Sequence, residues 1–175
     1  PCDCNQTKAA TIAAAEYVGP VYLRFGRPEV PNFTPANQEF IIGKANMLNK
    51  GKDVTIIATG HLVWPALEAA AQLEQNGVSA EVINIHTIKP LDNDAILKSV
   101  AKTRCVVTAE EHLMNNGLGD SVSQLLCRHL PAPVEYVAVD DHFGESGKPF
   151  ELMAKYGLDK DHIIDAAMRA IQRKA

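Results

Sequence analysis

The sequence predicts an α/β protein whose main domain, from residue 43 to residue 175, is a three-layer α/β/α fold with a mostly parallel sheet. Short continuous apolar runs alternate with helical patterns of about ten to fifteen residues, which is typical of βαβ units. Hydrophobic residues make up 46% of the chain and charged residues 22%, as in ordinary globular domains.

Three features precede this domain. Residues 6–17 (QTKAATIAAAEY) are rich in alanine and predict a helix, with Asn5 or Thr7 as its cap and a Gly-Pro pair as its stop. Residues 21–25 (VYLRF) predict a strand between glycine and proline. Residues 28–42 contain several prolines and predict an extended linker at a domain boundary.

Strands and helices then alternate along the domain. We expect parallel strands over residues 53–59, 80–85, 104–109 and 134–139. We expect helices over residues 62–75, 93–101, 121–130, 149–156 and 159–173. Residues 44–48 could add an edge strand before the first parallel one, and Pro65 is compatible with the first turn of its helix.

Composition argues against several functional classes. The net charge is −4 and no basic stripe with aromatic residues occurs, which argues against a nucleic-acid partner. No apolar run reaches the length of a membrane span, and the N-terminus has no signal pattern. The sequence starts at Pro1 rather than Met, so we expect it to derive from a longer protein.

The cysteine pattern predicts free thiols. The four cysteines are Cys2, Cys4, Cys105 and Cys127. Cys2 and Cys4 form a C-x-C pair, but no second pair completes a zinc site. Free thiols fit a reducing compartment, so we expect the protein in the cytoplasm.

Polar residues follow each predicted strand, where open α/β sheets bind their ligands. The four groups are Thr59-Gly60-His61, His86-Thr87, Glu110-Glu111-His112 and Asp140-Asp141-His142. Histidine and carboxylate suit acid–base catalysis or metal binding. Solvated loops and helix caps hold the same residue types, and we favour this structural interpretation.

Two further patterns could bind an anion. Gly117-Leu118-Gly119 precedes a helix whose free N–H groups could face an anion, with Asp120 or Ser121 as an alternative cap. The spacing is not G-x-G-x-x-G, so we expect a tight turn rather than a dinucleotide site. Arg24 and Arg27 could each offer a planar fork to a phosphate, or form a surface ion pair.

Several segments are informative because they occur together and in order. They are residues 19–24 (GPVYLR), 51–60 (GKDVTIIATG), 86–92 (HTIKPLD), 110–112 (EEH), 143–148 (FGESGK) and 156–158 (YGL). Together they resemble the transketolase family over nearly the whole chain. The segments 86–92 and 110–112 also occur in deoxyxylulose-phosphate synthases and in the β subunits of 2-oxoacid dehydrogenases, whereas 143–148 with 156–158 is more particular to transketolase.

The resemblance implies a domain division and an activity. Residues 1–27 would be the C-terminal end of a pyrimidine-binding domain, itself the remnant of a second α/β domain. Residues 28–42 would be the linker and residues 43–175 the transketolase C-terminal domain. The complete enzyme would transfer a two-carbon ketol unit between phosphosugars, as in the pentose phosphate pathway, with thiamine diphosphate and Mg²⁺.

The family places the diphosphate, the metal and the activating glutamate in regions that come before Pro1. The resemblance therefore implies no catalytic, cofactor-binding or metal-binding residue in this chain, and an isolated chain that is inactive. It implies contributions to dimer assembly and to the substrate channel. The expected partners are the N-terminal cofactor-binding part of the enzyme, in the same chain or a separate subunit, a second copy, and the phosphosugar.

Arg27 is the one site residue that the resemblance implies. It stands in residues 27–31 (RPEVP), where the family places an arginine that grips the sugar phosphate. The commoner pattern continues with glutamine and asparagine, whereas this chain has Pro28 and Glu29. We expect Arg27 to contact the substrate, at a site where Glu29 weakens the positive field.

Two other functions stay open. The domain could be a non-catalytic module that binds a small regulatory ligand at the strand ends. It could also be the equivalent part of a deoxyxylulose-phosphate synthase or of a 2-oxoacid dehydrogenase β subunit, although residues 143–148 favour transketolase.

Overall fold

The computed structural model describes residues 1–174 and confirms the α/β class with a mostly parallel sheet. The strands are β1 (Asn46–Asn49), β2 (Val54–Ala58), β3 (Ala80–Asn84), β4 (Val106–Leu113) and β5 (Val134–Val139). They lie in the order β1-β3-β2-β4-β5. The strand β1 pairs antiparallel with β3 at one edge, and the other neighbouring pairs are parallel.

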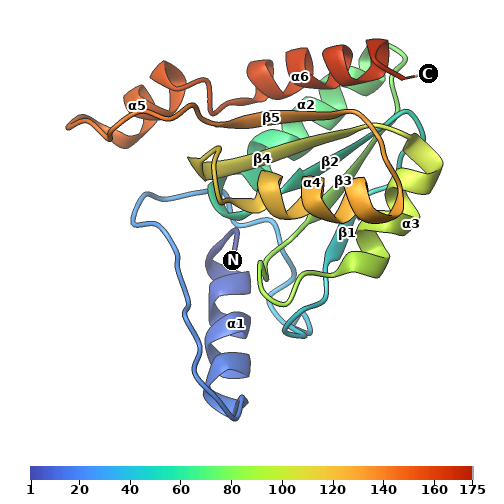
Figure 1. Cartoon of the computed structure of the whole chain (residues 1–175). Helices are drawn as coiled ribbons and strands as arrows, with labels where there is room; N and C mark the ends of the chain where they lie inside the picture. Colours follow the sequence, from blue (N-terminus) through green and yellow to red (C-terminus); the bar gives the residue numbers. More distant parts are fainter. Residues whose placement is uncertain (175) are drawn as a thin grey trace.

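Helices cover both faces of the sheet. The helices of the described chain are α1 (Cys4–Glu16), the 3-10 turn η1 (Gly60–Leu62), α2 (Val63–Gln75), α3 (Asn93–Thr103), α4 (Leu118–His129), α5 (Pro149–Lys155) and α6 (Lys160–Gln172). Helix α1 projects away from the sheet (Figure 1). Figure 1 shows α2 and α6 on one face and α3 and α4 on the other, which confirms the three layers. No helix within residues 1–174 is long and apolar enough to cross a membrane.

The core follows from the alternation of side chains along buried strands. In β2, Ile56 packs in the cluster beneath α2 and α6, whereas its neighbour Ile57 packs in the cluster beneath α3 and α4. All five residues of β2 are buried, as its continuous apolar run predicts for a central parallel strand.

The predicted strand at residues 21–25 is wrong for the described chain. These residues are extended, but a strand also needs a neighbour for its ladder of hydrogen bonds. No strand of residues 1–174 pairs with them, and Tyr22 is 89% exposed. Residues 28–42 contain neither helix nor strand, as expected of a linker, while the domain limits remain a prediction.

The first helix begins earlier than predicted because its cap is Asp3, rather than Asn5 or Thr7. The carboxylate of Asp3 accepts a hydrogen bond from the backbone N–H of Gln6 at 2.8 Å. Asp3 also accepts from the N–H of Phe33 at 2.9 Å and from the N–H and hydroxyl of Thr34 at 2.6 Å each. One buried carboxylate thus joins the start of α1 to the linker.

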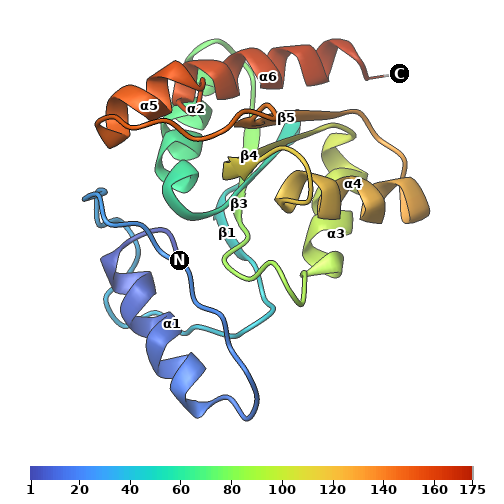
Figure 2. The ribbon, with the colours of Figure 1, turned by 60° about the vertical axis from the view of Figure 1, so that its left-hand side comes forward.

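The extended chain that begins at residue 17 returns from the far end of α1 toward the sheet and leads into the linker, as Figure 2 shows. Burial alone raises the pKa of Asp3, but the hydrogen bonds from Thr34, Gln6 and Phe33 outweigh it and hold this pKa below its usual value. The carboxylate is therefore charged when it ties α1 to the linker.

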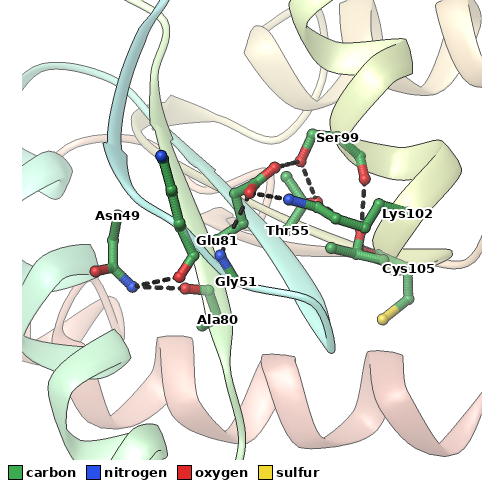
Figure 3. A network of polar contacts seen from close by, with 10 residues as sticks. Asn49, Gly51, Thr55, Ala80, Glu81, Ser99, Lys102 and Cys105 are labelled. Carbon is green, nitrogen blue, oxygen red and sulfur yellow. Dashed lines mark hydrogen bonds and ion pairs between the residues drawn. The ribbon is translucent and has the colours of Figure 1, made fainter.

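A second buried carboxylate, Glu81 on β3, joins this strand to α3 and to the turn before β2 (Figure 3). The hydroxyl of Ser99 on α3 donates to Glu81 at 2.5 Å, and Lys102 forms an ion pair with it. The N–H of Gly51 donates at 3.3 Å, and Ser99 also contacts the hydroxyl of Thr55 on β2 at 2.7 Å. Burial raises the pKa of Glu81, but Lys102 and Ser99 outweigh it, so the net pKa is lowered.

We predict that Glu81→Gln lowers the free energy of unfolding by about 1–3 kcal/mol at neutral pH, because buried donors lose a charged acceptor. Since the folded pKa lies below the unfolded one, this contribution is present above about pH 4.5 and is lost as the pH falls through the lowered pKa. Urea denaturation at several pH values checks both effects. The exposed Glu74→Gln is the matched control, and a difference between wild type and Glu81→Gln that does not narrow in acid would contradict the prediction.

Candidate functional site

The carboxyl ends of the parallel strands lie at one edge of the sheet, and two of the four predicted polar groups meet there. The Nδ1 atom of His61, in η1 after β2, lies 2.7 Å from a carboxylate oxygen of Glu111 on β4. The two side chains are 15% and 43% exposed. The hydrogen bond from His61 lowers the pKa of Glu111 and outweighs the opposing effect of burial, and the nearby Arg24 lowers this pKa further. The pair forms because β2 and β4 are neighbours in the sheet.

Residues 24–26 lie over this pair. Both terminal nitrogens of the Arg24 guanidinium donate to the backbone carbonyl of Glu111, at 3.3 and 3.4 Å. A Cβ atom added at Gly26 would overlap the Cε1 atom of His61, so only glycine allows this approach. Arg24 therefore binds a carbonyl group rather than forming the surface ion pair that the sequence left open.

A groove of about 500 Å³ opens beside the pair. His61 and Glu111 line it together with residues 28–31, Trp64 of α2 and Phe150 of α5. Trp64 also packs against Phe33 of the linker, with ring centroids 5.4 Å apart. The groove thus lies between the linker and the helices on the α2 face.

The start of α4 is already occupied by a carboxylate of the protein. The buried Glu110 accepts hydrogen bonds from the N–H groups of Leu118 at 2.7 Å and Gly119 at 2.8 Å. Burial raises the pKa of Glu110 despite these two bonds. The glycine turn is therefore the tight turn that the sequence predicts, and Glu110 fills the position where an external anion would bind.

Neither predicted alternative cap serves α4. Asp120 accepts from the N–H of Asn116 at 2.6 Å, and the hydroxyl of Ser121 donates to the carbonyl of Gly117 at 3.1 Å. Glu110 extends the helix N-terminally, so α4 begins at Leu118 rather than at the predicted residue 121. Sequence reasoning missed this cap because Glu110 is eight residues away from Leu118.

The other two strand-end groups take no part in the cluster. His86 stacks on Phe40 with centroids 4.0 Å apart, and burial lowers its pKa to about 4, which makes it a neutral packing residue. Residues 140–142 are exposed after β5. His112 is adjacent to Glu111 in the sequence but also lies outside the cluster. It is exposed beyond the buried part of β4, where its Nδ1 atom lies 3.0 Å from the carbonyl of Leu113.

The described residues do not by themselves fit thiamine diphosphate and Mg²⁺. Residues 1–174 contain no group of three or more His, Cys, Asp or Glu side chains placed to hold a metal ion. Four helix starts, which are natural diphosphate sites, already bind carboxylates of this chain. These carboxylates are Asp3 at α1, Asp92 at α3, Glu110 at α4 and Asp159 at α6.

Arg27, the predicted substrate contact, is exposed and directly follows Gly26. Within residues 1–174 its side chain forms no hydrogen bond or ion pair, so its guanidinium is available to a ligand. Its role stays a prediction. Sequence reasoning named His61 and Glu111 as strand-end residues, but nothing in the sequence singled out Gly26.

The comparison with known protein families decides the family. The profile described as "Transketolase, C-terminal domain" matches residues 43–163. This chain belongs to the transketolase C-terminal domain family. The match covers all five strands and most of the helices of the predicted domain of residues 43–175, which we call the sheet domain.

Relatives agree with this assignment. The 6-deoxy-6-sulfo-D-fructose transketolase subunit SqwH of Clostridium sp. (strain MSTE9) is 42% identical over 174 residues, covering 99% of this chain and 54% of that protein. The 1-deoxy-D-xylulose-5-phosphate synthase 1 of Geobacter sulfurreducens is 37% identical over 171 residues, covering 95% of this chain and 27% of that protein.

A solved structure extends the likeness to the leader, which is the segment of residues 1–42 before the matched domain. A split-gene transketolase, described as an inactive beta4 tetramer, superimposes with a TM-score of 0.97 at 42% identity, covering 100% of this chain and 57% of that one. This chain spans about half the length of that protein and of the first curated relative.

We predict that Glu110→Ala lowers the free energy of unfolding by about 0.5–2 kcal/mol, the usual cost of losing a helix cap. The N–H groups of Leu118 and Gly119 lose their acceptor and remain shielded from water. Urea denaturation of the wild type and variant measures the change. Glu68→Ala at an exposed position of α2 is the control, and an unchanged free energy for Glu110→Ala would contradict the role of Glu110.

Proposed function

We propose that this chain is the C-terminal part of a transketolase-type enzyme that transfers a two-carbon ketol unit between phosphosugars. The observation that carries the proposal is the alignment of 99% of the chain with a relative named as a transketolase subunit. That relative is named for a sulfonated sugar, so the donor and acceptor of this enzyme need their own assay. The exposed and unpaired guanidinium of Arg27 supports a phosphosugar here.

The cofactor of the proposed enzyme is thiamine diphosphate with Mg²⁺, held by the remainder of the enzyme. When bound, it supplies the carbanion chemistry of carbon–carbon cleavage. This chain contributes binding and orientation: Arg27 faces the phosphate of the sugar, and His61 and Glu111 form part of the wall of the substrate channel.

Exposed apolar side chains on the leader support contacts with other parts of the enzyme. Ile12 on α1 and Val18, Tyr22 and Phe25 in the extended chain after it are all more than half exposed, and Val18 is 97% exposed. Contiguous exposed apolar surface commonly marks an interface. We propose the cofactor-binding part, in the same chain or a separate subunit, as the main partner, and a second copy as the dimer partner. The four free cysteines fit a cytoplasmic enzyme.

We predict that the 175-residue chain alone catalyses no ketol transfer. The purified chain is incubated with thiamine diphosphate, Mg²⁺, a phosphorylated ketose donor and an aldose acceptor, and product is measured in a coupled assay. Adding the cofactor-binding part of the enzyme should give turnover, and that part alone is the control. Turnover by the isolated chain would overturn this assignment.

We predict that Arg27→Ala in the complete enzyme lowers kcat/KM for a phosphorylated sugar by about 10–100-fold, because one charge-assisted hydrogen bond to the phosphate is lost. The loss for the unphosphorylated sugar should be much smaller. Arg128→Ala, at an exposed position on α4, is the matched control. Equal losses of kcat/KM with both sugars would show that Arg27 does not contact the phosphate.

A second candidate activity rests on the relative from Geobacter sulfurreducens, which is named as a deoxyxylulose-phosphate synthase. Such an enzyme decarboxylates a 2-oxoacid, so release of CO₂ by the complete enzyme, without ketol transfer, would favour it. Saturable binding of a small ligand by the isolated chain, unchanged by Arg27→Ala, would instead favour a regulatory module.

A further inference from the structure

We propose that His61 is a positioning residue for Arg27: Glu111 holds the imidazole, and the imidazole supports the segment of residues 24–27 that carries Arg27. The inference rests on the proposed function, which assigns Arg27 to the phosphate of the substrate. His61 belongs to the sheet domain, and it would affect substrate affinity by holding the leader segment that carries Arg27.

His61 is a firm support. It lies in η1, which begins at Gly60 two residues after the last residue of the buried strand β2, and Leu62 after it is fully buried. The backbone N–H of Thr59 donates to the carbonyl of Ala109 at 3.1 Å, which holds the end of β2 against β4. The 2.7 Å contact with Glu111 then fixes the ring itself.

Glu111 acts on the segment twice. Its carboxylate holds His61, and its backbone carbonyl accepts the two hydrogen bonds from Arg24. Gly26 rests against the ring of His61 so closely that a Cβ would overlap two ring atoms. Glu111 therefore fixes position 24 directly and position 26 through His61. The Cα atom of Arg27 is only one peptide unit, about 3.8 Å, from that of Gly26.

Few other contacts fix this segment. Within residues 1–174, residues 24–27 form no backbone hydrogen bond to the rest of the chain and join no sheet. The contacts at Arg24 and Gly26 therefore decide its path over the strand ends. A His–Glu pair that only stabilised the fold would affect the phosphorylated and the unphosphorylated sugar equally.

The test is a double-mutant cycle in the complete enzyme. In Gly26→Ala the added methyl group clashes with His61 and moves Arg27, so KM for a phosphorylated sugar should rise about tenfold with kcat within about twofold. KM for the unphosphorylated sugar should change by less than about twofold. Gly144→Ala, where an added Cβ meets no atom within 4 Å, is the matched control.

The variant His61→Ala removes both the support and the clash. Alone it should raise KM for the phosphorylated sugar about threefold, and Gly26→Ala in its background should add no more, because the ring that caused the clash is gone. In an Arg27→Ala background, Gly26→Ala should also have no further effect. Additive effects in either background, or equal effects on both sugars, would overturn the proposal.

A readout that needs no activity separates this proposal from the proposed function. If His61 supports the segment, limited trypsin cleavage of the purified 175-residue chain between Arg24 and Phe25 should be about fivefold faster in His61→Ala than in wild type, because Gly26 loses its packing contact with the imidazole. Equal cleavage rates would sink the positioning role even if ketol transfer is confirmed. Faster cleavage in an enzyme without ketol transfer would support the positioning role and reject the proposed function.

Discussion

The buried carboxylate of Asp3 is the interaction on which the arrangement of the leader depends. It accepts hydrogen bonds from Gln6, Phe33 and Thr34, and so fixes the start of α1 and the end of the extended segment at the same point. The chain between them must leave along α1 and return across the carboxyl edge of the sheet. A neutral side chain at this position would leave buried donors unsatisfied, which costs more than an absent contact.

The sheet domain uses carboxylates of its own where α/β proteins commonly bind anions. Glu110 occupies the start of α4 and Asp92 the start of α3, so the helix dipoles on this face of the sheet already have a carboxylate of the chain. In the leader, by contrast, Arg27 is exposed and its guanidinium is unpaired among the described residues. At this edge the sheet domain therefore contributes carboxylates, and the leader contributes the exposed guanidinium of Arg27.

The sheet domain was largely predictable because its signals are local. The apolar run of β5 was predicted with the limits that the structure shows, and the other parallel strands begin within two residues of the prediction. The strand at residues 21–25 was wrong because pairing needs a neighbour, which no local pattern supplies. The caps Asp3 and Glu110 were missed because their bonds to Thr34 and Leu118 depend on the tertiary fold.

The same reasoning explains why only part of the candidate site could be predicted. Four polar strand ends were visible in the sequence, but strand order selects which of them meet, and β2 has β4 beside it. That adjacency brings His61 to Glu111, and the glycine at position 26 lets the leader approach the ring. A substitution in the sheet domain can therefore change the position of a leader residue without touching the substrate. The two parts of the chain are joined at this edge because Glu111 contacts both His61 and Arg24.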